Sequence, residues 1–182
     1  MASTTPVKRD GEAEGPSDDS SYDYSHTLVV RYSECDGQGV VFNAHYQAYC
    51  DVTLDLWLRD RMGKEWSVTI GQDFSMVVAS AFTYRAPATF LDALTVRGRI
   101  ARWGRTSFDV EYRGEVMRGG GSDPEGEEAA AREIFAGKMT YVVVDGNKRP
   151  TGIPPEFKAK MPRGRESGGS GGDRGGRVRS RL

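Results

Sequence analysis

Cysteine and histidine are both scarce in this chain of 182 residues. Its two cysteines, Cys35 and Cys50, are too few for a disulfide framework and do not form a CxxC pair. With only His26 and His45 beside them, the sequence contains no metal-ligand spacing, so we predict no metal site. We expect both cysteines to be free thiols, which favours a reducing, cytoplasmic compartment.

Long hydrophobic runs are also missing. The most apolar short stretch, 76–82, falls far below the roughly 20 residues that a membrane-spanning helix needs. The N-terminus lacks the basic segment followed by an apolar segment that marks a secretory signal. The glycines at 119–121 do not precede the helix of a βαβ unit, so they do not indicate a nucleotide-binding loop. We therefore predict a soluble protein with no membrane partner and no cofactor.

An excess of charge of one sign is absent overall, because the formal net charge is −1. The two ends nevertheless differ. Residues 1–23 hold two bases and six acids, a net of −4, and residues 163–182 hold six arginines and two acids, a net of +4. Both ends are poor in apolar residues, so we predict disordered tails at 1–23 and 162–182 around one domain at 24–161. No aromatic residue is interleaved with the C-terminal arginines, which favours a solvated tail over a nucleic-acid partner.

What the sequence does contain is one long helix, predicted over Ala44–Met62, a stretch without glycine or proline. Asn43 is suited to cap its start, and Gly63 supplies a residue that can end it. Apolar side chains occupy positions most of the way round it: Tyr46, Tyr49, Cys50, Val52, Leu54, Leu56, Trp57 and Leu58. We expect such a helix to be buried on nearly all sides.

Strand-like segments precede and follow this helix, and no second helix of comparable length is indicated. β-Branched and aromatic residues alternate loosely with polar ones in these segments. The expected strands are 24–32, 66–70, 74–84, 93–103, 106–117 and 132–144. Residues 118–131 are predicted to be an enlarged hairpin loop, and 150–161 to hold one short helical turn. An antiparallel sheet of five or six strands would have to curl round the central helix, which defines an α+β fold.

One carboxylate lies in the loop that leads into the helix. This loop, 33–42, contains Asp36 followed by Gly37 and Gly39. A helix N-terminus offers unpaired N–H groups and the positive end of the helix dipole. An acid beside such donors suits acyl transfer, because one group attacks or deprotonates water while the others hold the developing oxyanion. The alternative is an Asx turn, a common use of Asp next to Gly.

The string ECDGQGVVFNAHYQAYCDVTLDLWLRDRMG resembles the motif of the 4-hydroxybenzoyl-CoA thioesterase-like acyl-CoA thioesterases, which have the hotdog fold. The residues that fall on this motif are Asp36, Gly39, Val40, Val41, Phe42, Tyr46, Trp57, Leu58 and Gly63. A second stretch, 84–92, is similar to the strand and proline-containing turn of that family. The resemblance covers about residues 24–160 and implies a hotdog fold, in which the curled sheet wraps the long helix.

The resemblance also implies a function, the hydrolysis of an acyl-CoA or acyl-carrier-protein thioester. It gives Asp36 the role of nucleophile or general base, and it gives the backbone N–H groups near Gly39 and Val40 the role of polarising the thioester carbonyl. It further implies a homodimer or homotetramer with each site shared between subunits.

Three residues at the start of the helix are candidates for substrate binding: Tyr46, His45 and Asn43. We expect Tyr46 to pack in the core and to line the acyl pocket. His45 is a candidate to assist Asp36 or to bind the acyl group, and a purely structural His45 is an open alternative. The family often has His and Asn at the positions of Asn43 and His45, so here the order is swapped.

Other residues near the loop have competing interpretations. Glu34 either pairs with Asp36, which would raise one of the two pKa values, or is a solvated charge at a strand end. Cys35 adjoins Asp36, but no histidine stands at a recognisable partner spacing, so an inert thiol is favoured. The side chains that are candidates for contacts to the CoA phosphates are Arg85, Arg102 and Arg105.

Two other functions stay open at this point. One is a hotdog hydratase or dehydratase that acts on acyl thioesters and pairs Asp36 with His45. The other is a non-catalytic protein that binds acyl thioesters.

Overall fold

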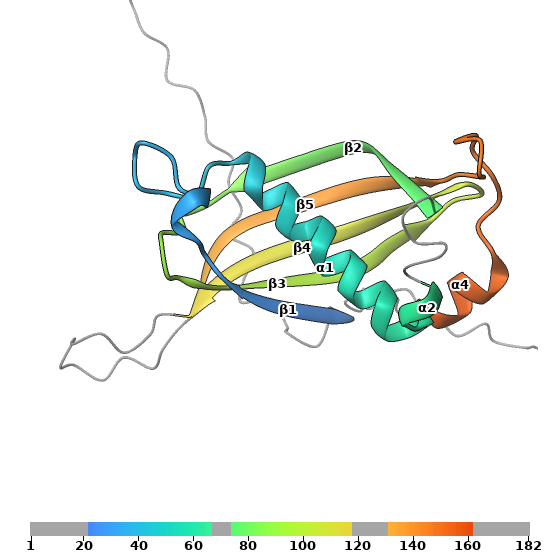
Figure 1. The fold of residues 1–182 in the computed structure, drawn as a ribbon, viewed down its shortest axis with the longest axis horizontal. Helices are drawn as coiled ribbons and strands as arrows, with labels where there is room; N and C mark the ends of the chain where they lie inside the picture. Colours follow the sequence, from blue (N-terminus) through green and yellow to red (C-terminus); the bar gives the residue numbers. More distant parts are fainter. Residues whose placement is uncertain (1–21, 67–73, 118–130, 162–182) are drawn as a thin grey trace, which may run out of the picture.

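The computed structural model describes residues 22–66, 74–117 and 131–161. The strands are β1 (Tyr24–Val29), β2 (Ser75–Tyr84), β3 (Ala93–Trp103), β4 (Ser107–Met117) and β5 (Ala131–Val143). The helical elements are η2 (Tyr32–Glu34), α1 (Ala44–Met62), α2 (Lys64–Trp66) and α4 (Pro155–Lys160). Figure 1 shows α1 lying diagonally across one face of the sheet.

The strands form one antiparallel sheet in the order β1-β3-β4-β5-β2. β1 and β2 are its two edges, so the sheet curves but does not close (Figure 1). The predicted α+β fold with five antiparallel strands and one long helix is therefore confirmed for the described part of the chain. β4 pairs with β5 from Ser107↔Val142 to Met117↔Ala131, so the two strands are hairpin partners, as predicted; the residues between them lie outside the described ranges.

The helix and the sheet meet at a close contact around Trp57, which is fully buried. Gly98 on β3 faces this side chain: a Cβ atom at Gly98 would lie 3.9 Å from the Trp57 ring and 3.4 Å from the Tyr112 ring. The ring of Tyr24 on β1 stacks on Trp57 with 5.9 Å between centroids. These contacts fix α1 over β1 and β3.

The predicted bounds of α1 are confirmed, and Gly63 ends it, with φ +96° and an N–H that donates to Arg59 O at 2.9 Å. Two finer expectations are wrong. The Asn43 side chain makes no capping hydrogen bond, because Asn43 already has helical dihedral angles of φ −54° and ψ −30°. Burial is also one-sided: Val52 is 47% exposed and Asp55 is exposed, because an open sheet covers only one side of the helix.

The expected strand at 66–70 is not confirmed, since Lys64–Trp66 is helical and 67–73 lie outside the described residues. The N-terminal tail was predicted to run to residue 23, but Tyr22 and Asp23 are part of the domain. Asp23 N–H donates to Gly98 O at 3.0 Å, and the Arg99 guanidinium lies 5.5 Å from the centre of the Tyr22 ring.

The remaining tail predictions, for 1–21 and 162–182, fall outside the described ranges. The short helical turn expected within 150–161 is confirmed as α4. Within the three described ranges, no helix combines the length and the apolar character needed to cross a bilayer.

Candidate active site

The loop that carries Asp36 is a tight hairpin. Its two sides are joined by Phe42 N–H to Glu34 O at 2.9 Å and by Asp36 N–H to Val40 O at 2.9 Å. Gly39 closes the turn with φ +76°, and its N–H donates to Asp36 O at 2.9 Å. Glycine adopts this left-handed conformation without steric penalty, so the sequence suits the turn.

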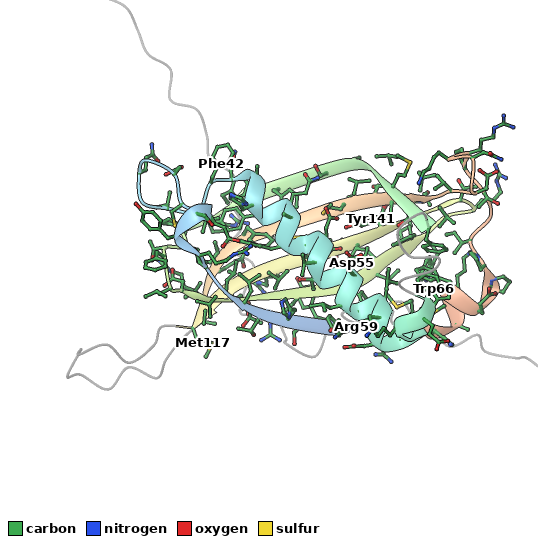
Figure 2. The ribbon with its side chains drawn as sticks, viewed as in Figure 1. Phe42, Asp55, Arg59, Trp66, Met117 and Tyr141 are labelled. Atoms are coloured by element: carbon green, nitrogen blue, oxygen red, sulfur yellow. The ribbon has the colours of Figure 1, made fainter. Side chains whose placement is uncertain are left out.

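The hairpin is also fastened to the rest of the fold. Val41 N–H donates to Ala88 O at 2.9 Å, and Val40 forms a β-bridge with Thr89. Ala88 N–H in turn donates to the Tyr46 hydroxyl of α1 at 3.3 Å. Figure 2 shows Phe42, at the end of the hairpin, beside the first turn of α1, with Trp66 beyond the far end of the helix. The hairpin is thus held at the N-terminus of α1.

The carboxylate of Asp36 is half-buried and has two different oxygens. Oδ1 accepts the N–H of Gln38 at 2.8 Å, which is the Asx turn considered from the sequence. Oδ2 accepts no hydrogen bond from the part of the chain that the structure describes. The Asx turn therefore orients the carboxylate and leaves one oxygen available, so a turn role and a chemical role are compatible.

Backbone donors are also available in the hairpin and at the start of α1. His45 N–H donates to Phe42 O at 2.9 Å. The N–H groups of Val40, Asn43 and Ala44 donate to no acceptor among the described residues. The sequence predicted that N–H groups near Gly39 and Val40 polarise a thioester carbonyl. Gly39 N–H already donates to Asp36 O, so Val40 and the helix start supply the donors that are available for this role. These donors are suited to hold a negative oxygen.

The candidate substrate-binding residues lie in different surroundings. Tyr46 is 4% exposed, so it belongs to the core, as expected. The half-buried His45 ring lies 6.4 Å from the Phe42 ring and 6.3 Å from the Tyr49 ring, measured between centroids. Asn43 is exposed, and its carbonyl oxygen accepts the Tyr84 hydroxyl at 3.4 Å. All three stand within one turn of the helix start, and their roles toward a substrate stay predictions.

Glu34 is the residue that the sequence reasoning placed wrongly. It is neither solvated nor paired with Asp36: it is 4% exposed and bound by Arg31. Burial is the largest single effect and would raise the pKa of Glu34, but the hydrogen bonds and charge of Arg31, together with Tyr49, outweigh it and leave the pKa below its ordinary value. The sequence signal that was available is the spacing, an arginine three residues before the acid.

The two cysteines are free thiols, as predicted. Cys50 is buried, and burial raises its pKa well above the ordinary value, which makes this thiol inert. Cys35 is half-buried and its Sγ contacts Arg31 O at 3.8 Å. Within the described ranges, no group of three or more histidine, cysteine or acidic side chains is arranged to hold a metal ion.

The three arginines that are candidates for contacts to the CoA phosphates differ in their ion pairs and in their exposure. Arg102 is committed to Asp109, with nitrogen–oxygen distances of 2.7 and 3.0 Å. Arg85 is 60% exposed and makes a looser ion pair with Glu133 at 3.5 Å. Arg105 is exposed. Arg85 and Arg105 therefore remain the better candidates.

An open antiparallel sheet curled against one long helix, with an acidic hairpin at the helix N-terminus, defines a hotdog-fold protein. A family model of the thioesterase-like superfamily matches residues 30–161. The chain therefore belongs to the thioesterase-like superfamily.

Individual relatives agree with this assignment. An acyl-CoA thioester hydrolase of Zymomonas mobilis, described as uncharacterized, is 28% identical over 86 residues, which are 47% of this chain and 52% of that protein. The chain thus spans about half of that relative's length.

Two solved structures are similar in fold. A 4-hydroxybenzoyl-CoA thioesterase in complex with 4-hydroxybenzoyl-CoA matches with a TM-score of 0.65 at 16% identity, over 76% of this chain and 97% of that chain. The PA5185 protein from Pseudomonas aeruginosa matches with a TM-score of 0.63 at 25% identity, over 78% and 90%.

Proposed function

We propose that this protein hydrolyses the thioester of an acyl-CoA, or of an acyl-carrier protein, to a free acid and a thiol. The observation that carries the proposal is the Asp36 carboxylate, oriented through Oδ1 by Gln38 N–H at 2.8 Å in the hairpin that leads into α1. Membership of the thioesterase-like superfamily and the name of the Zymomonas mobilis relative support it.

We also propose a cytoplasmic location, which the two free thiols support.

In this mechanism Asp36 Oδ2 either attacks the acyl carbon or takes a proton from the attacking water. As a base, Asp36 takes a proton from water, the water oxygen bonds to the acyl carbon, and the C–S bond breaks; the sulfur takes up that proton and leaves as the thiol. As a nucleophile, Asp36 Oδ2 bonds to the acyl carbon as the C–S bond breaks, and water then hydrolyses the resulting anhydride, which frees the acid and restores Asp36. Backbone N–H groups of Val40, Asn43 and Ala44 hold the negative oxygen that forms on the way. One well-placed donor of this kind is worth about 3–4 kcal/mol in the transition state.

We further propose a homodimer as the minimal form of the expected dimer or tetramer. β2 is an edge strand of 10 residues, and no lysine or proline interrupts it. Its side chains are largely exposed, with Met76 at 47%, Val78 at 59% and Tyr84 at 47%. An exposed apolar edge of this length invites pairing with another chain. Pairing of two identical strands about a two-fold axis within one continuous sheet is antiparallel.

Antiparallel pairing has a consequence for the site. Tyr84, at one end of β2, reaches the start of α1 through its hydrogen bond to Asn43 O. The other end of β2, at Ser75, would then lie beside the helix start of the partner subunit. Each acyl site would therefore be completed by the neighbouring protomer.

The test of the activity is hydrolysis of a panel of acyl-CoA esters by the wild type and Asp36→Ala, followed by thiol release. We expect turnover by the wild type and its loss in the variant. Equal rates in the two proteins would reject the mechanism. A change in enoyl absorbance without thiol release would identify a hydratase, and tight ester binding without turnover would identify a binding protein.

The test of the dimer is the mass in solution, measured by light scattering. We expect the wild type to be at least dimeric and Val78→Lys to be monomeric, because the substitution places a charge on the pairing edge. Met117→Lys is the control, since Met117 is similarly exposed, at 54%, but lies at the end of β4. A monomeric wild type at micromolar concentration would reject this assembly.

A further inference from the structure

Glu34 is a buried carboxylate in an unusual place. The buried polar or charged side chains in the described part of the chain are Glu34, Thr53 and Asp109. Thr53 lies within α1 and Asp109 within β4, where regular structure holds them. Glu34 instead ends the short turn η2, two residues before Asp36. Burial of a charge is unfavourable unless hydrogen bonds replace the lost water, so its partners are informative.

Arg31 supplies those partners from both its backbone and its side chain. Arg31 N–H donates to Oε2 of Glu34 at 2.7 Å. The Arg31 guanidinium donates to Oε1 through Nε at 2.9 Å and through Nη2 at 2.6 Å. The Arg31 side chain is 77% exposed and the Glu34 side chain 5% exposed, so the guanidinium covers the carboxylate from the solvent side.

On its inner side the carboxylate faces α1. The Tyr49 hydroxyl is buried and makes no hydrogen bond of regular geometry, but Glu34 lies close enough to add to the effect of burial and raise the pKa of Tyr49. The Tyr49 ring in turn lies against His45 at 6.3 Å and against Tyr46 at 6.1 Å between centroids. Glu34 therefore lies beside Tyr49, in the second turn of the helix.

The same residue begins the hairpin that carries Asp36. Its carbonyl oxygen accepts Phe42 N–H at 2.9 Å, the first rung of the hairpin. Cys35 is extended, with φ −90° and ψ 142°, so the side chains of Glu34 and Asp36 leave the chain on the same face. A single extended residue therefore separates Glu34 from Asp36, at the base of the hairpin that carries Asp36.

From this arrangement we propose that Glu34, closed by Arg31, is a positioning residue that holds the Asp36 hairpin against α1. The inference rests on the proposed function, because it assumes that Asp36 acts on the substrate. Glu34 touches no reacting atom in this account; it sets the place of the carboxylate relative to the N–H groups at the helix start.

The first test is Glu34→Gln, which keeps the size of the side chain and removes its charge. We expect kcat for an acyl-CoA substrate to fall by about 10- to 100-fold with KM nearly unchanged, since a misplacement of about 1 Å can reduce a rate by 10²-fold. The matched control is Asp109→Asn, another buried carboxylate bound by an arginine, Arg102, and remote from the hairpin. The control should lower the melting temperature and leave kcat unchanged.

The second test separates positioning from general stability. In the Asp36→Asn background, Glu34→Gln should reduce the residual rate no further, because a positioning residue has nothing left to position. A further fall of the same size as in the wild type would overturn the proposal, and so would an unchanged kcat in the single variant.

If Glu34→Gln does not fold, Arg31→Lys provides the same test. The substitution keeps the positive charge over Glu34 but removes the two guanidinium N–H donors that bind its carboxylate, so we expect a smaller fall in kcat at constant KM. No change in kcat for this variant would overturn the proposal. Failure of the proposed function is distinguishable, since Asp36→Asn would then retain the wild-type rate.

Discussion

Two turns in this protein have the same local structure and different surroundings. One begins at Asp36 and the other at Asp145, and each starts with the dipeptide Asp-Gly. In the first, the Asp36 N–H donates to Val40 O at 2.9 Å; in the second, the Asp145 N–H donates to Arg149 O at 2.9 Å. In both, the fourth residue donates back to the aspartate carbonyl at 2.9 Å and has a positive φ, +76° for Gly39 and +61° for Lys148.

Their carboxylates are alike as well. Gln38 N–H donates to Asp36 Oδ1 at 2.8 Å, and Asn147 N–H donates to Asp145 Oδ1 at 2.9 Å. An oriented aspartate in an Asp-Gly turn is therefore not by itself a sign of an active site. It is a stable way to close a hairpin.

The surroundings make the difference. Asp145 is exposed, and its Oδ1 accepts a second backbone N–H, from Arg149 at 3.0 Å. Asp36 is half-buried in the hairpin that leads into α1; this hairpin is hydrogen-bonded to Ala88, and the buried Glu34 stands at its base. Tertiary contacts, rather than the turn itself, distinguish the candidate catalytic acid.

The most direct way to test this comparison is to make the same substitution in both turns. Asp36→Asn should reduce thioester hydrolysis by about 10²–10⁴-fold, the usual contribution of a general base. Asp145→Asn should leave the rate within about twofold of the wild type, because Asp145 is exposed and lies outside the hairpin that leads into α1. Equal losses in the two variants, measured by thiol release, would contradict the comparison.

The fourth residue of each turn offers a second test. A Cβ atom at Gly39 would meet nothing within 4 Å, so Gly39→Ala should be strained only by its positive φ. The expected loss is about 1–2 kcal/mol in the free energy of unfolding. Lys148→Gly relieves the equivalent strain, and we expect it to change stability by no more than about 0.5 kcal/mol. Urea unfolding of both variants checks the contrast.

The support beneath the Asp36 hairpin can be weakened through Tyr46. Tyr46→Phe removes the acceptor of Ala88 N–H, at 3.3 Å, and should lower stability by about 1 kcal/mol together with a few-fold loss of kcat. Tyr112→Phe is the control: its hydroxyl lies 3.0 Å from that of Tyr141, away from the hairpin. It should lower stability and leave kcat unaltered. A kcat that falls equally in both variants would argue against a specific support.

The smallest expected effect is a change in how the stability of the folded state depends on pH. The pKa of Glu34 lies below its ordinary value of 4.5, because Arg31 and Tyr49 together outweigh burial, which is the largest single effect and acts in the opposite direction. A depressed pKa stabilises the folded state at every pH above the ordinary value, and this contribution disappears as the pH falls through the folded-state pKa. Unfolding between pH 5 and 3 should therefore be less dependent on pH in Glu34→Gln than in the wild type. Parallel curves would contradict the assignment.

The sequence was sufficient for the parts of the fold that depend on local pattern. The bounds of α1 and its end at Gly63 follow from helix propensity and from glycine. β3 was predicted over its observed range, Ala93–Trp103, because its alternation is regular. The turn alone could not identify Asp36 as the candidate catalytic acid, because Asp145 forms the same turn. Asp36 was singled out by the family motif that surrounds it.

The errors concern features set by packing. Glu34 looked like a solvated charge because its burial depends on Tyr49, fifteen residues further along the chain, and on Arg31 folding back over it. The prediction that α1 is buried on nearly all sides is wrong for the single chain, in which Val52 is 47% exposed. An apolar residue in the sequence does not show which element, if any, covers it. Asn43 was expected to cap the helix, but the chain enters α1 already in helical conformation, so its side chain makes no capping bond.

The exposed outer edge of β2 has a consequence for the solubility of the newly made protein. Ten successive residues, Ser75–Tyr84, present an uncovered backbone with neither a lysine nor a proline to discourage other extended chains. In the proposed homodimer, pairing with a second copy covers this edge and protects it from other extended chains, so we expect solubility to depend on how fast two copies meet.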